Sequence, residues 1–125
     1  MKATFLNPVC KEVYESNKLK DFDVKKEKLG QTLCLIHSEI SEALEAARTN
    51  SYTDANLNAV GGWVLDEDFI LAYKVMIKGT FEEEIADAFI RLMDLVGALE
   101  MDIDKHIELK RRYNSLREYK HGKSF

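Results

Sequence analysis

Apolar residues recur three and four positions apart along most of the chain, a pattern that predicts helices. No alternation of apolar and polar residues, as a strand would require, extends beyond a few positions, and no internal repeat is present. One proline and six glycines also favour long helices over a turn-rich β fold. We therefore predict an all-α protein with helices over about residues 8–17, 24–48, 67–78, 81–100 and 103–119.

Polar residues at the ends of these segments predict where the helices begin. Asn7 precedes a proline, so we expect Asn7 to be the N-cap of the first helix. Thr80 and Glu83 have the spacing of a capping box. Asp102 or Asp104 is expected to cap the last helix. Residues 49–62 are rich in Asn, Ser, Thr, Asp and Gly and are predicted to be the least regular segment.

Two of the predicted helices carry a continuous apolar stripe that we expect to face the core. In the helix over 24–48 the stripe consists of Leu29, Leu33, Ile36, Ile40, Leu44 and Ala47. In the helix over 81–100 it consists of Ile85, Phe89, Leu92, Met93 and Val96. Gly30 lies at the start of the first stripe, where it offers a place for a close helix crossing.

Each of these two helices also carries a pair of acidic residues three positions apart. The pairs are Glu39 with Glu42 and Glu84 with Asp87. Residues three apart lie on one side of a helix, so each pair can aim at one point. Both pairs lie well to one side of their own apolar stripe. If the helices pack together, four carboxylates converge and repel one another unless a cation neutralises them. Carboxylate oxygens suit Mg²⁺ or Mn²⁺, and Mg²⁺ held in this way often binds phosphates.

Length and composition place limits on the class of protein. The chain has 125 residues, 46% of them hydrophobic and 32% charged, and is expected to form a single domain over 1–125. It contains no apolar run of membrane-spanning or signal-peptide length, so we expect a cytoplasmic protein with no membrane partner. Cys10 and Cys34 form no metal-binding pattern and are expected to be reduced thiols.

Charge is distributed unevenly along the chain. The net charge of −4 is the sum of +5 over residues 105–125 and −9 over residues 1–104. An acidic body argues against a nucleic-acid partner, which would require a basic surface. A basic end beside an acidic metal site is better suited to a small anionic ligand.

Three segments together resemble the MazG-like, all-α nucleotide pyrophosphohydrolases. They are LIHSEISEALE at 35–45, EEIADAFIRLMDL at 83–95 and KRRYNSLREYKHGK at 110–123. The resemblance implies a four-helix-type bundle that assembles as a homodimer or homotetramer. It also implies Mg²⁺-dependent hydrolysis of a nucleoside triphosphate to monophosphate and pyrophosphate. The 41 residues between Glu42 and Glu84 exceed the common family spacing, and we expect residues 49–79 to add an extra helix near the nucleotide pocket.

The resemblance also suggests roles for individual residues. The metal ligands would be Glu39, Glu42, Glu84 and Asp87, and either Glu39 or Glu42 would activate the attacking water. The substrate-binding candidates are Lys110, Asn114, Arg117, Trp63 and Arg91. Trp63 is either a core or interface residue or a ring that stacks on the base. Arg91 either contacts phosphate or pairs with Glu84 or Asp87.

Other functions use some of the same residues. A nucleotide- or metal-binding helical module without turnover, acting as a regulator, would need the same acids. A phosphatase that releases inorganic phosphate would differ only in its products. A di-iron carboxylate bundle is disfavoured because neither acid pair supplies the Glu-x-x-His motif that such sites use.

Overall fold

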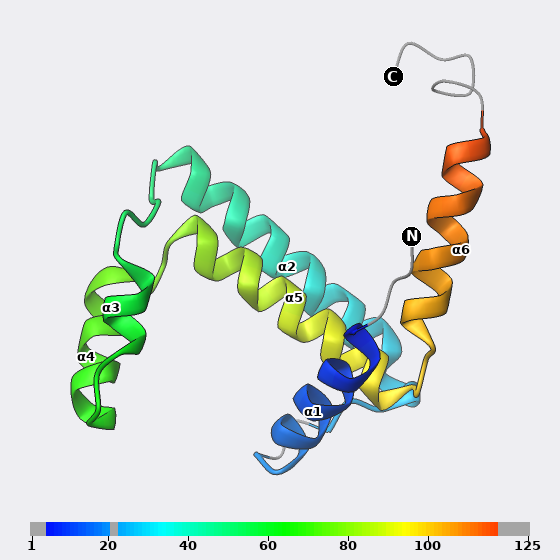
Figure 1. The fold of residues 1–125 in the computed structure, drawn as a ribbon, viewed down its shortest axis with the longest axis horizontal. Coiled ribbons are helices and arrows are strands. Elements are labelled where there is room, and N and C mark those ends of the chain that lie inside the picture. The colour runs from blue at the N-terminus through cyan, green and yellow to red at the C-terminus, as the bar shows by residue number, and fades with distance from the viewer. Residues whose placement is uncertain (1–4, 21–22, 118–125) are drawn as a thin grey trace. The chain divides into compact units, whose positions relative to one another are not determined.

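The computed structural model describes residues 5–20 and 23–117 (Figure 1). Within these residues the chain is all-helical and contains no strand, which confirms the predicted fold class. The elements are α1 (Leu6–Lys18), the 3₁₀ turn η1 (Lys26–Lys28), α2 (Leu29–Arg48), α3 (Leu57–Gly61), α4 (Asp66–Met76), α5 (Phe81–Ala98) and α6 (Ile103–Leu116). No helix in these ranges has the length and apolar character needed to cross a bilayer. The end of the third family-like segment and the basic tail, residues 118–125, lie outside the described residues.

The chain divides into two compact units, and α5 contributes residues to both. One unit contains Lys28–Leu92, and the other contains the described parts of Met1–Glu27 and Met93–Phe125. In the Lys28–Leu92 unit, α2 and the first part of α5 run side by side in opposite directions (Figure 1). The prediction of one domain stays a prediction.

Small side chains form the buried part of the α2–α5 pair. The buried apolar residues are Ala43 and Ala46 on α2 and Ala88 on this part of α5. Alanine lets two helix backbones approach closely because it projects only one carbon toward the neighbouring helix. The acidic residue Glu39 is buried on the same side of α2.

The stripe that we expected to face the core is largely exposed, so that prediction is wrong for most of the stripe in this unit. Leu33, Ile40 and Leu44 on α2, with Phe89 and Leu92 on α5, are each between 43% and 59% exposed. Periodicity correctly identified an apolar face, but two such faces compete on α2. The face of α2 that carries Ala43 and Ala46 is the buried one, because small side chains let the two helices pack closer together. We refer to these five residues as the apolar face.

The two ends of the segment between α2 and α5 are joined by hydrogen bonds. The N–H of Phe81 donates to the carbonyl of Ser51 at 2.7 Å. The N–H of Thr53 donates to Glu82 Oε1 at 3.1 Å, and the Thr53 hydroxyl donates to the carbonyl of Met76 at 3.0 Å. These bonds close the base of the long connection. Residues 49–79 therefore do not separate the two acidic helices, and they add two helices, α3 and α4, rather than the one expected.

The turn from α4 into α5 contains the predicted capping box in a modified form. Thr80 Oγ1 accepts from the N–H of Glu83 at 3.3 Å. The Glu83 carboxylate accepts from the N–H of Gly79 at 2.8 Å and from the Tyr73 hydroxyl at 2.6 Å. Gly79 has a φ of +81°, a conformation that L side chains rarely adopt. Burial raises the pKa of Tyr73, and its bond to Glu83 raises that pKa further.

In the other unit, α1 and α6 cap one another. The Asp104 carboxylate accepts from the N–H groups of Leu6 and Asn7 at 3.0 and 3.1 Å, and Asn7 Oδ1 accepts from the N–H of Asp104 at 3.1 Å. The prediction that Asn7 caps its own helix is therefore wrong, because its side chain serves α6. Asp102 is the N-cap of α6 and accepts from the N–H of Lys105 at 3.2 Å.

The close helix crossing occurs at Gly97 rather than at Gly30. A Cβ at Gly97 would clash with the carbonyl oxygen of Cys10 and would lie 2.7 Å from the Cβ of Tyr14. A Cβ at Gly30 would meet nothing within 4 Å. The contact between α1 and the end of α5 therefore depends on the absence of a side chain at Gly97.

Gly97→Ala should destabilise the protein by about 1–3 kcal/mol, because α1 must move away from α5. Gly30→Ala is the matched control and should stabilise by about 0.5 kcal/mol through the lower entropy of the unfolded chain. Urea denaturation followed by circular dichroism measures both changes. Equal effects of the two variants would contradict the assigned crossing.

Candidate functional site

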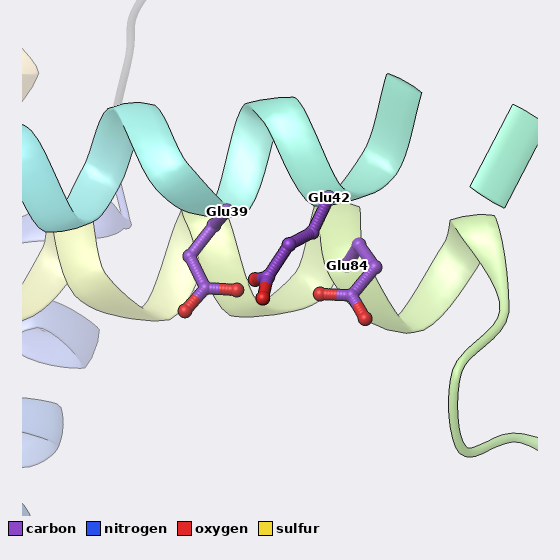
Figure 2. Close-up of side chains that lie close together, drawn as sticks. All are labelled: Glu39, Glu42 and Glu84. Carbon is purple, nitrogen blue, oxygen red and sulfur yellow. The ribbon is translucent and has the colours of Figure 1, made fainter. Parts of the chain in front are cut away.

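Three carboxylates from two helices point to one place (Figure 2). Glu39 and Glu42 come from successive turns of α2, and Glu84 comes from the first turn of α5. Each residue offers one oxygen, and these oxygens all lie within 4.8 Å of one another. Two ligands on opposite sides of a Mg²⁺ ion are separated by about 4.2 Å, so little adjustment would let the three share one cation. We call Glu39, Glu42 and Glu84 the acid cluster.

The backbone fixes where each carboxylate of the cluster begins. The i, i+3 spacing places Glu39 and Glu42 on one side of α2. The N–H of Glu84 donates to the carbonyl of Thr80 at 3.1 Å, so Glu84 is anchored in the first turn of α5. The positive end of the α5 dipole favours an acidic residue there.

Glu39 is the deepest member of the acid cluster and pairs with an arginine on the other helix. It is 7% exposed, and its Oε1 accepts from Arg91 Nε at 2.7 Å. The acidic partners expected for Arg91 were Glu84 or Asp87. Arg91 pairs with Glu39 instead, because its guanidinium reaches across to α2 rather than along α5. The role predicted for Arg91 in phosphate binding stays a prediction.

The environment of Glu39 favours its charged form. Burial acts to raise the pKa of Glu39, but hydrogen bonding with Arg91, Glu42 and Glu84 and the charge of Arg91 together lower it. A carboxylate that stays ionised in a buried position is a ready ligand for a cation.

The neighbouring acids behave in the opposite way. Hydrogen bonding with Glu39 and the charge of Glu39 raise the pKa of Glu42. Burial raises the pKa of Glu84, and the charges of Glu42 and Asp87 raise it further. Burial also raises the pKa of Asp87, with the charge of Glu39 acting in the same direction. The charges of neighbouring acids thus contribute to all three raised pKa values, and a bound cation would offset that contribution.

Asp87 belongs to the electrostatic environment of the acid cluster but not to its compact group of oxygens. It is half-buried, and its charge acts on Glu42 and Glu84. Among the described residues, the three glutamates form the one group of three or more possible ligands whose atoms all lie within 4.8 Å of one another. Asp87 as a fourth ligand stays a prediction.

The residues predicted to bind substrate lie in different parts of the chain. Trp63 is 54% exposed and lines a mainly apolar hollow of about 390 Å³ beside α3 and α4. Lys110, Asn114 and Arg117 belong to α6 and its C-cap, in the other unit. Their substrate roles stay predictions.

Tyr113 on α6 is a residue that the sequence analysis did not single out. Lys110 Nζ lies 5.1 Å and Arg117 Cζ 5.5 Å from the centre of the Tyr113 ring. The i+3 and i+4 spacing of a cation, an aromatic residue and a second cation was the signal that could have revealed it.

No protein-family model matches the chain, and comparisons with curated proteins and with solved structures find no match either. The case for a function therefore rests on the residues and on the geometry of the acid cluster.

Glu84→Gln should stabilise the metal-free protein at pH 7, because it removes one of several mutually repelling charges. We expect an increase in Tm of roughly 2–4 °C, a change below about 1 kcal/mol for a chain of this size. A carboxyl whose folded-state pKa is raised opposes folding above that pKa, and the penalty vanishes below the ordinary value of 4.5, where both states are protonated. The gain should therefore shrink as the pH is lowered toward 4.

Glu45→Gln provides the control for this experiment. Glu45 is an exposed residue of α2 outside the acid cluster, so its replacement should change Tm little at any pH. Scanning calorimetry between pH 4 and 7 measures both variants. A fall in Tm of Glu84→Gln at pH 7 would show that the carboxylate is stabilised where it lies.

Proposed function

We propose that this protein hydrolyses a nucleoside triphosphate to a monophosphate and pyrophosphate with the help of Mg²⁺. The observation that carries the proposal is the acid cluster, in which ligand oxygens from α2 and α5 lie within 4.8 Å of one another. The resemblance of three segments to the MazG-like pyrophosphohydrolases supports the same conclusion. We also propose that the chain forms the four-helix-type bundle of that family, with residues 49–79 inserted between its two acidic helices.

Glu39, Glu42 and Glu84 fit a divalent cation by the chemistry of their donors. They offer hard oxygen ligands, and the charges of neighbouring acids contribute to the raised pKa values of Glu42 and Glu84. Asp87 is the candidate for a fourth ligand. A bound Mg²⁺ would neutralise charge on the phosphates and lower the pKa of water. Mn²⁺ would suit the same ligands.

We propose that Glu42 is the base that accepts a proton from the attacking water. Glu39 is buried, whereas Glu42 is exposed and can meet a water. The raised pKa of Glu42 also makes it the better base of the two at neutral pH. The water oxygen attacks the α-phosphorus, the bond from that phosphorus to the bridging oxygen breaks, and pyrophosphate leaves.

The basic residues of α6 are proposed to hold the phosphates or the sugar. Lys110, Asn114 and Arg117 recur every three to four residues, and two of them are cations that lie beside the Tyr113 ring. Trp63 is proposed to contact the base, because a half-exposed indole in an apolar hollow can stack on a planar ring.

We also propose that two or more copies of the chain associate through the apolar face. Counting about 100° per residue, Ile40 and Leu44 lie about 160° around α2 from Glu42, and Phe89 lies about 140° around α5 from Glu84. Association would therefore leave the acid cluster open. Exposed apolar surface of this kind on an α-helical pair commonly marks an interface.

Purified protein with Mg²⁺ and a panel of nucleoside triphosphates should yield monophosphate and pyrophosphate in equal amounts, and chelation should stop the reaction. Glu42→Ala should lower turnover by at least about a hundredfold, because it removes both a ligand and the proposed base. Chromatographic separation of the products, with pyrophosphate and inorganic phosphate assayed separately, gives the measurement.

Glu45→Ala is the matched control and should keep full activity, since Glu45 is exposed on the same helix outside the acid cluster. Release of inorganic phosphate would refute the assigned bond. Nucleotide that binds without turnover would instead favour a regulatory binding module.

Ile40→Glu should weaken self-association at least about tenfold, because it places a charge within the apolar face. Leu71→Glu on α4 is the control, since Leu71 is exposed but lies off this face. Sedimentation equilibrium measures the association constants. A wild-type protein that stays monomeric at all concentrations would refute the proposed interface.

A further inference from the structure

Arg91 supplies the one ion pair that the acid cluster makes within the described part of the chain. Its Nε lies 2.7 Å from Glu39 Oε1, while the side chains of Arg91 and Glu39 are 42% and 9% exposed. The buried member of the pair is thus Glu39, the proposed metal ligand, and the guanidinium of Arg91 lies at the solvent edge of the site.

We propose that Arg91 is a built-in counterion that a divalent cation displaces from Glu39, and that the freed guanidinium then binds a phosphate oxygen of the substrate. The inference rests on the proposed function, since it concerns the same acid cluster. In addition to the proposed function, Arg91 and the metal compete for Glu39, and binding of the metal is thereby coupled to binding of the phosphates.

The competition follows from the chemistry of Glu39. Because the carboxylate is buried, few solvent molecules can satisfy it, and it keeps a cation beside it in either state. A divalent ion carries twice the charge of a guanidinium and approaches an oxygen to about 2.1 Å, against the 2.7 Å seen for Arg91. The divalent ion therefore holds Glu39 more strongly, and its charge repels the guanidinium.

The geometry of Arg91 allows this exchange. Its attachment uses Nε, which is one of the five N–H donors of a guanidinium. Because the side chain is 42% exposed, it can swing toward solvent without opening the α2–α5 packing. A guanidinium released beside a bound cation is well placed for the bidentate contact that arginine makes with phosphate.

Arg91 also stabilises the site before the metal binds. Without a cation beside it, Glu39 would add an unpaired buried charge to the repulsion between α2 and α5. Arg91 supplies one positive charge, which holds the helices together and is weak enough to be replaced.

Binding of Mn²⁺ alone provides the first test. The wild type is compared with Arg91→Gln, Arg91→Lys and Arg48→Gln by calorimetric titration and by paramagnetic resonance of free Mn²⁺. Arg48 lies in the last turn of α2, so Arg48→Gln removes the same charge away from Glu39. Arg91→Gln should bind Mn²⁺ roughly three- to tenfold more tightly than the wild type, the range expected for a lost charge-assisted hydrogen bond that is partly exposed. Arg48→Gln should change the affinity less than about twofold, and Arg91→Lys should lie between the wild type and Arg91→Gln.

Pyrophosphate binding in saturating Mn²⁺ provides the second test and should move in the opposite direction. Arg91→Gln should bind pyrophosphate roughly tenfold more weakly than the wild type, and Arg91→Lys should restore part of the affinity. Circular dichroism of each variant confirms that the helices are retained.

Unchanged or weaker Mn²⁺ binding by Arg91→Gln, with the helices intact, would overturn the competition and leave Arg91 as a structural cross-link. Unchanged pyrophosphate binding would overturn the second half of the proposal. Both failures are compatible with hydrolysis by the wild type. Absence of Mn²⁺ binding in the wild type and in Arg91→Gln alike would refute this inference and the proposed function together.

Discussion

The repulsion among Glu39, Glu42 and Glu84 is the constraint on which the rest of the Lys28–Leu92 unit depends. Their ligand oxygens lie within 4.8 Å of one another, so the two helices that carry them are pushed apart at the point where they must stay together. Alanine packing at Ala43 and Ala88 opposes this repulsion by bringing the helices close. Arg91 opposes it directly with a positive charge on Glu39. The acid cluster is therefore held by the fold at the expense of local stability, as is common at functional sites.

The pairing of α2 with α5 also explains how a long connection is accommodated. The bonds of Thr53 to Glu82 and Met76, with that of Phe81 to Ser51, close the loop where it leaves α2. Closing a longer loop adds little entropic cost once its ends are fixed. Residues between those ends can then form α3 and α4 and present Trp63 without moving the carboxylates. The scaffold of the site and the surface that we propose to recognise the base are built from separate segments.

The sequence predicted those features that depend on local spacing. The acid pairs lie on helices as expected, and Thr80 and Glu83 form their capping box because the relevant contacts are within four residues. Three of the four acids converge as expected, but two other predictions about the partners of individual residues are wrong. Asn7 caps α6 rather than α1, and Arg91 reaches Glu39 rather than an acid on its own helix. No periodicity along one helix can reveal which residue of another helix lies opposite.

The exposed apolar face shows the same limit and has a consequence for function. Periodicity identified Ile40 and Phe89 correctly as members of an apolar stripe, but it could not tell a stripe that is buried within one chain from one that stays exposed. Leucine and isoleucine on the close side of α2 would hold α5 too far away for Glu84 to join Glu39 and Glu42. Alanine on that side brings the carboxylates together and leaves the larger side chains outside. The geometry that assembles the acid cluster therefore also produces the apolar surface, so the proposed metal site and the proposed self-association would both follow from the same helix packing.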